Sequence, residues 1–103
     1  MRKITKNAYN AFINKKRFNS GNTDIYLDFD ENPHMRLFDN VIAKMDDCDD
    51  IWISDGDYGT SKTTEERLSA FINIRISKGT FIIDEKFEWD GCWFNVSEYK
   101  RNH

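Results

Sequence analysis

The sequence is poor in the residue types that build most catalytic and metal centres. Its 103 residues include two cysteines, two histidines and one proline. Cys48 and Cys92 form no CxxC pair, as is typical of reduced thiols in a cytosolic protein. A multi-ligand zinc site, a catalytic triad and a glycine-rich phosphate loop are all missing, so no cofactor is predicted. Asp, Glu and Tyr can still perform acid–base chemistry, but no pattern here positively indicates an enzyme.

Long hydrophobic runs are also missing. No apolar segment approaches the ~20 residues that a membrane-spanning helix needs, so no membrane association is predicted. Aromatic residues are abundant instead, at 15% of the chain, with eight Phe, four Tyr and three Trp. These side chains can bury enough apolar surface to offset the chain entropy lost on folding. We therefore predict a single domain over residues 1–103, in which the polar residues 97–103 form a frayed tail.

The net charge of -3 conceals an uneven distribution along the chain. Residues 1–27 carry a net charge of +5, residues 28–57 carry -8, and residues 58–103 are neutral. Such blocks predict separate positive and negative surface regions, which concern partners rather than the fold. The basic run Lys15–Arg17 is explained by its place at a helix end, and the overall negative charge does not predict direct nucleic-acid binding.

Hydrophobic periodicity predicts an α+β fold, with two helices packed on a mainly antiparallel sheet. The strands are joined by turns too short to connect parallel neighbours. The predicted order is α-β-β-β-β-α-β-β-β, with helices over about 6–16 and 63–72, strands over 23–29, 34–38, 41–45, 51–53, 74–76 and 80–83, and a final aromatic hairpin over 87–96.

Two helix caps and one strand face follow from local patterns. Thr5 is a suitable N-cap for the first helix, and Thr63 with Glu66 forms a capping box for the second. Alternation from Ile25 to Phe29 predicts that Phe29 shares the buried face of its strand. Of the Trp residues beside the Asp90-Gly91 turn, at least one is expected to be partly exposed.

The densest acidic segment surrounds a cysteine, with carboxylates at Asp46, Asp47, Asp49 and Asp50. Close carboxylates could bind a hard cation or share a proton, yet on a short turn they can equally point into water. Together with the next acidic loop they form the predicted interaction surface, which comprises Asp46, Asp47, Asp49, Asp50, Asp55, Asp57 and Tyr58.

The loop after the fourth predicted strand partly matches a calcium-binding loop. Asp55, Asp57 and Glu66 fall at positions 1, 3 and 12 of the EF-hand pattern. Gly59 at position 5 and Thr60 at position 6 depart from it. A solvated loop is the favoured interpretation, and a metal site at Asp55, Asp57 and Glu66 is the alternative.

A set of short motifs extends over nearly the whole chain. They are Ile4-Thr5-x-x-Ala8-x-x-Ala11-Phe12, Phe18, Asn22-Thr23-x-Ile25, Leu37, Asn40-x-Ile42-Ala43, Trp52-Ile53-Ser54, Thr63-Thr64-x-Glu66-Arg67-Leu68 and Glu88-Trp89-Asp90-Gly91-x-Trp93. In these motifs the chain resembles a group of small accessory proteins encoded by tailed bacteriophages. Most matched positions are caps, turns and core residues, so the resemblance supports a shared fold more than a shared activity. The segment 46–50 is not part of the pattern.

The resemblance implies a non-structural protein made in the host cytoplasm. Phage proteins of this size and charge often bind and block a host protein, including defence systems of the CRISPR or restriction type. Our leading hypothesis is therefore an inhibitor that binds a host protein through its acidic loops. One alternative is a nucleotide-signal-binding protein or metal-dependent enzyme that uses Asp55, Asp57 and Glu66. Another is a structural protein that forms homo-oligomers through exposed strand edges.

Overall fold

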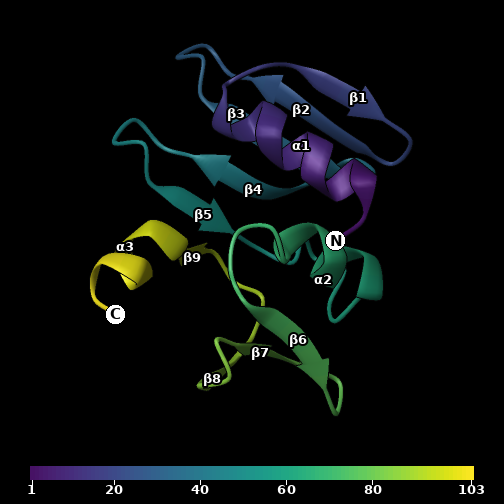
Figure 1. The fold of residues 1–103 in the computed structure, drawn as a ribbon, viewed down its shortest axis with the longest axis vertical. Coiled ribbons are helices and arrows are strands. Elements are labelled where there is room, and N and C mark those ends of the chain that lie inside the picture. The colour runs from purple at the N-terminus through teal and green to yellow at the C-terminus, as the bar shows by residue number, and fades with distance from the viewer.

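A computed structural model describes residues 1–103 and contains three helices and nine strands in two antiparallel sheets (Figure 1). The α+β class and the predicted order of its main elements are confirmed. In chain order the elements are α1 Lys3–Ile13, β1 Phe18–Ser20, β2 Thr23–Leu27, β3 Pro33–Leu37, β4 Asn40–Met45, β5 Ile51–Ile53, α2 Lys62–Leu68, β6 Ile74–Ser77, β7 Thr80–Ile83, β8 Phe87–Trp89, β9 Phe94–Asn95 and α3 Val96–Arg101.

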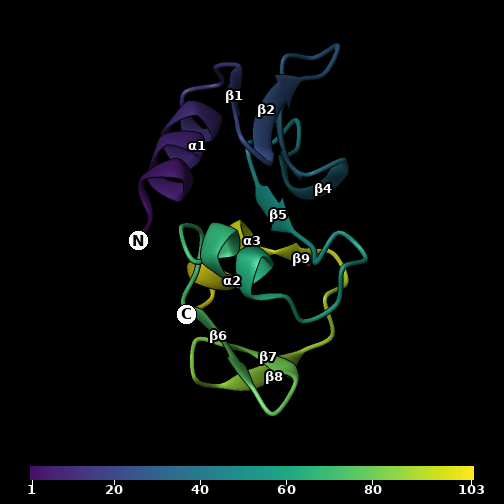
Figure 2. The ribbon, with the colours of Figure 1, turned by 90° about the vertical axis from the view of Figure 1, so that its right-hand side faces the viewer.

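The larger sheet has six strands in the order β1-β2-β3-β4-β5-β9. Short turns connect β1 through β5 as successive antiparallel neighbours, and β9 pairs with β5 at the far edge. Alternate residues of these strands are buried, so one face of the sheet is apolar. The helix α1 lies along this face, as Figure 2 shows, and buries Ala8 and Phe12 there.

The smaller sheet, in the order β6-β7-β8, lies at the other end of the molecule (Figure 1). The helix α2 lies between the two sheets in the views of Figures 1 and 2. One cluster of 17 buried hydrophobic residues includes Ile53 of the larger sheet and Phe81 of the smaller one. This shared core fixes the two sheets relative to each other, and with them the loops between them. No helix is both long and apolar enough to cross a membrane.

Both predicted helix caps are wrong in position. The helix α1 begins before Thr5, whose buried hydroxyl instead accepts a hydrogen bond from Arg67 Nη1 at 2.9 Å. The helix α2 is capped by Ser61, whose Oγ accepts from the backbone N–H of Thr64 at 3.2 Å. The carboxylate of Glu66 accepts from the backbone N–H of Arg2 at 2.8 Å and closes no capping box.

The C-terminal residues are not a frayed tail. They form α3, whose N-cap Asn95 accepts a hydrogen bond from the backbone N–H of Glu98 at 2.8 Å. Arg101 pairs with Asp50 at 2.9 Å, and Lys100 Nζ donates to the carbonyl of Phe71 at 2.7 Å. These polar contacts act together with the buried Val96 and with Tyr99, which packs against the core, to hold the segment in place.

Candidate functional site

The predicted interaction residues lie at opposite ends of strand β5. The segment 46–50 forms the turn that enters β5, whereas Asp55, Asp57 and Tyr58 follow the end of β5. The structure therefore does not gather the seven predicted residues into one surface. It creates two acidic loops, which we call the entry loop (residues 46–50) and the exit loop (residues 54–58).

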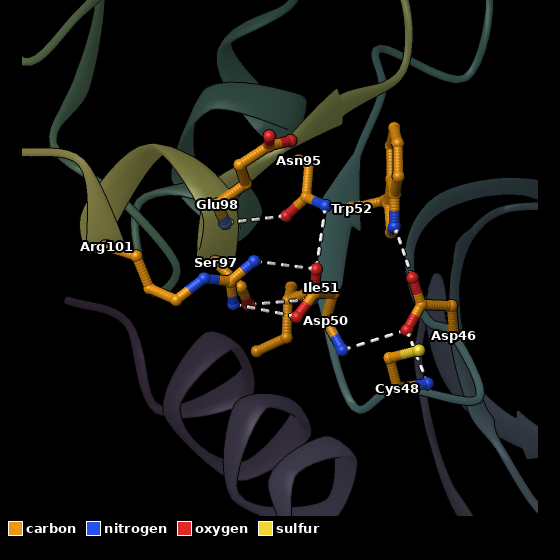
Figure 3. Close-up of polar contacts among 9 residues, drawn as sticks. All are labelled: Asp46, Cys48, Asp50, Ile51, Trp52, Asn95, Ser97, Glu98 and Arg101. Atoms are coloured by element: carbon orange, nitrogen blue, oxygen red, sulfur yellow. Dashed lines mark hydrogen bonds and ion pairs between the residues drawn. The ribbon is translucent and has the colours of Figure 1, made fainter.

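In the entry loop, Asp46 organises its own backbone. Its Oδ1 accepts hydrogen bonds from the backbone N–H groups of Cys48 and Asp50, both at 2.9 Å. Its Oδ2 accepts from Trp52 Nε1 at 2.9 Å, as Figure 3 shows. The Trp52 hydrogen bond is the main cause that lowers the pKa of Asp46, and backbone donors add to it. The Asp46 carboxylate is therefore a structural group.

Asp50 connects the entry loop to the C-terminal helix. Its carboxylate accepts from Arg101 Nη1 at 2.9 Å and Nη2 at 3.1 Å, and from Asn95 Nδ2 at 3.0 Å (Figure 3). These hydrogen bonds, Arg101 first, lower the pKa of Asp50 to about 2. The adjacent backbone N–H of Ile51 donates to Ser97 Oγ at 2.8 Å. Asp50 thus anchors α3 to the sheet.

The other two entry-loop carboxylates also have partners within the chain. Asp47 Oδ1 accepts from Asn32 Nδ2 at 2.6 Å, and Asp49 pairs with Lys15 Nζ at 3.0 Å. All four carboxylates of the entry loop are therefore used at least once internally. Neutralising them together would perturb the fold as well as any partner contact.

The exit loop lines a cavity with a volume of about 520 Å³. Three segments form its wall: the β3–β4 turn, the exit loop and the β8–β9 turn. Its carboxylates come from all three, and are Asp39, Asp55, Asp57 and Asp90. None of the four forms an ion pair with a basic side chain. We call this feature the acidic cleft.

Backbone and side-chain contacts together hold the acidic cleft in shape. The backbone N–H of Asp55 donates to the carbonyl of Gly91 at 2.9 Å. Gly91 has a φ of +91°, and a Cβ there would collide with the Asp55 carboxylate. On the opposite side, Asn40 Nδ2 donates to the carbonyl of Gly56 at 2.6 Å. One backbone hydrogen bond, the close approach of Gly91 to the Asp55 side chain and one side-chain donor therefore hold the three segments together.

Exposed aromatic side chains lie at the cleft and beside it. Phe38 is 60% exposed and contacts Tyr58 edge-on, with ring centroids 6.2 Å apart. Tyr58 donates its hydroxyl to the carbonyl of Leu37 at 2.6 Å, which fixes the ring. Trp93, which lines the cleft, is 41% exposed and has Lys44 Nζ 4.2 Å from its ring centroid. Trp93 confirms the prediction that at least one Trp beside the Asp90-Gly91 turn is partly exposed, whereas Trp89 is buried.

The chemistry of the cleft does not favour nucleophilic catalysis. Cys92 lines it, and the hydrogen bond and charge of Asp90, followed by burial and the charges of Asp55 and Asp57, raise the pKa of this thiol. The thiolate fraction at neutral pH is thereby reduced. The same negative field repels phosphate groups and attracts cationic ones.

The predicted calcium-like ligand set is not assembled. Glu66 lies on α2 and bonds to the N-terminal segment, while Asp55 packs against Gly91. No group of three or more His, Cys, Asp or Glu side chains is placed to hold a metal ion. Helix α2 places the Glu66 carboxylate against the backbone N–H of Arg2. The spacing of the acids in the sequence does not reveal this contact.

Comparison with known proteins places the chain in a phage family. The family model described as Kyanoviridae Gp96 protein matches residues 1–102. The chain belongs to the Kyanoviridae Gp96 protein family. The resemblance to phage proteins is thereby confirmed. No curated protein and no solved structure gives a significant match.

Two carboxylates of the acidic cleft could not be assigned to it from the sequence. Asp39 and Asp90 were placed in turns but not linked to Asp55 and Asp57, because the β3–β4 and β8–β9 turns meet only in the folded chain. The available signal was the turn composition itself, since Asp39-Asn40 and Asp90-Gly91 each put a carboxylate at a strand end.

Proposed function

We propose that the protein binds a host protein and blocks it, and that the acidic cleft is its principal binding surface. The observation that carries the proposal is the convergence of four carboxylates without basic partners on one cavity. Exposed aromatic rings at the cleft and beside it add the kind of anchor residue that dominates protein interfaces. Acidic groups at such a surface would steer and orient a basic partner.

The chemistry of the cleft suggests the class of target. A partner must present Lys or Arg side chains to the four carboxylates and apolar groups to Phe38, Tyr58 and Trp93. Proteins that hold DNA or RNA present such basic surfaces, because they neutralise phosphates. A small acidic domain that covers such a surface would block nucleic acid from binding. We therefore propose an anti-defence role, of the anti-CRISPR or anti-restriction type.

The cavity volume alone would also accommodate a small molecule, since ligand pockets commonly enclose ~300–1,000 Å³. Its charge opposes a nucleotide signal, however, because four carboxylates surround the space where phosphates would lie. No observation in the structure favours that second function over protein binding.

The test compares two charge-matched variants of the full chain. In the cleft variant, Asp39→Asn and Asp57→Asn remove two carboxylates that make no hydrogen bond in the structure. Asn also tolerates the positive φ of Asp57, which is 65°. In the control variant, Glu88→Gln and Glu98→Gln remove the same charge from exposed side chains outside the cleft.

Each tagged protein is produced in the bacterial host and captured, and bound host proteins are identified by mass spectrometry. We expect wild type and the control variant to retain the same host protein and the cleft variant to lose most of it. Purified partner should lose its own activity when wild-type protein is added at equal concentration, and lose less with the cleft variant. Equal recovery by all three proteins, or a partner whose activity is unaffected, would refute the proposal.

A further inference from the structure

The turn between β2 and β3 displays an aromatic side chain with no contact that would bury it. Phe29 is fully exposed, with a relative accessibility of 108%. Strand alternation predicted this residue on the buried face, but β2 ends at Leu27 and the chain has already turned at Phe29. Phe29 therefore adds nothing to the core and leaves a large apolar ring in contact with water.

The turn that carries Phe29 is closed by hydrogen bonds on both sides of it. Asp28 Oδ1 accepts from the backbone N–H groups of Asp30 at 2.9 Å and Asn32 at 3.0 Å. The Asp28 N–H donates to the carbonyl of Asn32, and the Glu31 N–H donates to the carbonyl of Asp28. Because the backbone is fixed before any contact forms, little ordering entropy is lost when Phe29 binds.

A side-chain contact fixes the position of this turn relative to the entry loop. The buried Asn32 donates its Nδ2 to Asp47 Oδ1 at 2.6 Å. Figure 1 shows that the β2–β3 and β4–β5 turns project on the same side of the larger sheet. Together, residues 28–32 and the entry loop form one protruding feature, which we call the Phe29 tip.

Negative charge surrounds the exposed ring. Asp30 and Glu31 directly follow Phe29, both are exposed, and their carboxylates make no hydrogen bond or ion pair within the chain. The entry loop adds Asp47 to the same feature. A single exposed aromatic is common on protein surfaces. Asp28, which precedes the ring, is paired with His34 at 2.9 Å, so the unpaired carboxylates are the two that follow it. A rigid turn that presents an aromatic ring beside two unpaired carboxylates has the composition of an interface anchor with a charged rim.

We propose that the Phe29 tip is a second protein-binding surface, distinct from the acidic cleft. Its partner is a protein with an apolar pocket that accepts the Phe29 ring and with Lys or Arg side chains around that pocket. The charge complementarity follows from Asp30, Glu31 and Asp47. Since the entry and exit loops flank opposite ends of β5, the tip and the cleft can each bind without the other.

The first experiment places p-benzoyl-L-phenylalanine at position 29 of the full chain, produced in the bacterial host and irradiated. A matched protein carries the same photoreactive residue at the exposed position 88, on the smaller sheet. We expect a covalent adduct with one host protein from position 29 and none from position 88. Adducts only with a second copy of this chain, or equal adducts from both positions, would overturn the proposal.

The second experiment measures affinity for the purified host protein that the adduct identifies. Phe29→Ala should weaken binding by about 30-fold, as is typical for the loss of an interface anchor. Asp30→Asn with Glu31→Gln should weaken it several-fold and reduce its dependence on salt. Circular dichroism should show both variants folded, since neither removes a side-chain contact seen in the structure. Unchanged affinity of Phe29→Ala would overturn the proposal.

The two proposed binding surfaces can be tested independently of each other. The cleft variant with Asp39→Asn and Asp57→Asn should leave the position-29 adduct intact, because it changes nothing in the Phe29 tip. Loss of that adduct in the cleft variant would show that the tip is not an independent surface. Loss of host-protein recovery with an intact adduct would support both proposals.

Discussion

The entry loop and the exit loop are similar in sequence but have different roles in the structure. Both are short and acidic, and only the three residues of strand β5 lie between them. Every carboxylate of the entry loop accepts a hydrogen bond or pairs with a cation. The exit loop instead contributes carboxylates without cationic partners to a cavity. Acidic residue counts therefore do not distinguish structural from available carboxylates.

The difference comes from which donors the fold brings to each loop. Around the entry loop lie the side chains of Trp52, Asn95 and Arg101, all of which donate to its carboxylates. Around the exit loop the neighbouring turns carry further acids, Asp39 and Asp90, and the donor side chain there, Asn40, bonds to the carbonyl of Gly56 rather than to a carboxylate. Side-chain donors reach all four carboxylates of the entry loop, whereas in the exit loop only the Asp55 carboxylate accepts a hydrogen bond, from the backbone N–H of Asp57 at 2.9 Å. This contrast makes predictions that stability measurements can test.

The largest expected effect comes from a methyl group added to the cleft. Gly91→Ala forces a Cβ against the Asp55 side chain at a residue whose φ is +91°. Backbone strain and overpacking together should cost about 3 kcal/mol of unfolding free energy. Gly59→Ala is the matched control, since its φ is +70° and no atom lies within 4 Å of its added Cβ. Strain alone should cost that control about 1 kcal/mol in urea denaturation. Equal losses would show that the close approach of Gly91 to Asp55 does not hold the cleft.

Removing the Asp46 carboxylate should have the next largest effect. Asp46→Ala leaves two backbone N–H groups and Trp52 Nε1 without their acceptor. With a discount for partial exposure to solvent, we expect a loss of about 2 kcal/mol. Asp46→Asn keeps one acceptor oxygen and should lose less. Urea denaturation followed by Trp fluorescence measures both, and an unchanged midpoint for Asp46→Ala would contradict the structural role of the entry loop.

Acid should release the C-terminal helix α3 from the sheet. The pKa of Asp50 is lowered to about 2 in the folded protein from an ordinary value of 3.8. A lowered folded pKa stabilises the folded state above the unfolded pKa, and this stabilisation is lost as pH falls toward the folded pKa. The α3 amides should therefore lose protection between about pH 4 and pH 2.

Amide exchange observed by NMR at several pH values measures this release. In Asp50→Asn the α3 amides should exchange faster at neutral pH, and the change between pH 4 and pH 2 should be much smaller. The same pH dependence in wild type and Asp50→Asn would show that Asp50 does not anchor α3.

The main strands and the sheet class could be predicted from the sequence because they depend on local alternation. Ile25, Met35 and Ala43 are buried and face each other across β2, β3 and β4. Residues held by distant polar contacts could not be predicted in this way. The segment Val96–Arg101 has little apolar periodicity and is anchored by Asp50, 51 positions away from Arg101. Its local signal was Asn95 followed by Glu98, a pattern typical of a helix start.

The candidate site was only half predictable for the same reason. Asp55, Asp57 and Tyr58 were identified, because acids and an aromatic residue follow a strand end in the sequence. Asp39 and Asp90 reach the same cavity from turns that are distant along the chain. The prediction for Phe29 was wrong because the strand ends before it, where the Asp28 carboxylate accepts a hydrogen bond from the backbone of its own turn. Asp commonly forms such turns, and the alternation of apolar residues does not show where one begins.

The smallest expected effect on stability belongs to the cleft variant, Asp39→Asn with Asp57→Asn. Neither carboxylate accepts a hydrogen bond, so the unfolding free energy should change by no more than about 0.5 kcal/mol. The sign should be a slight gain, because two of four like charges around one cavity are removed. Urea denaturation at low and high salt checks this, since added salt screens the repulsion and should reduce the gain. A loss comparable to that of Asp46→Ala would mean that both loops need their carboxylates to fold. A stable variant that no longer retains a host protein would mean that the cleft carboxylates serve binding alone.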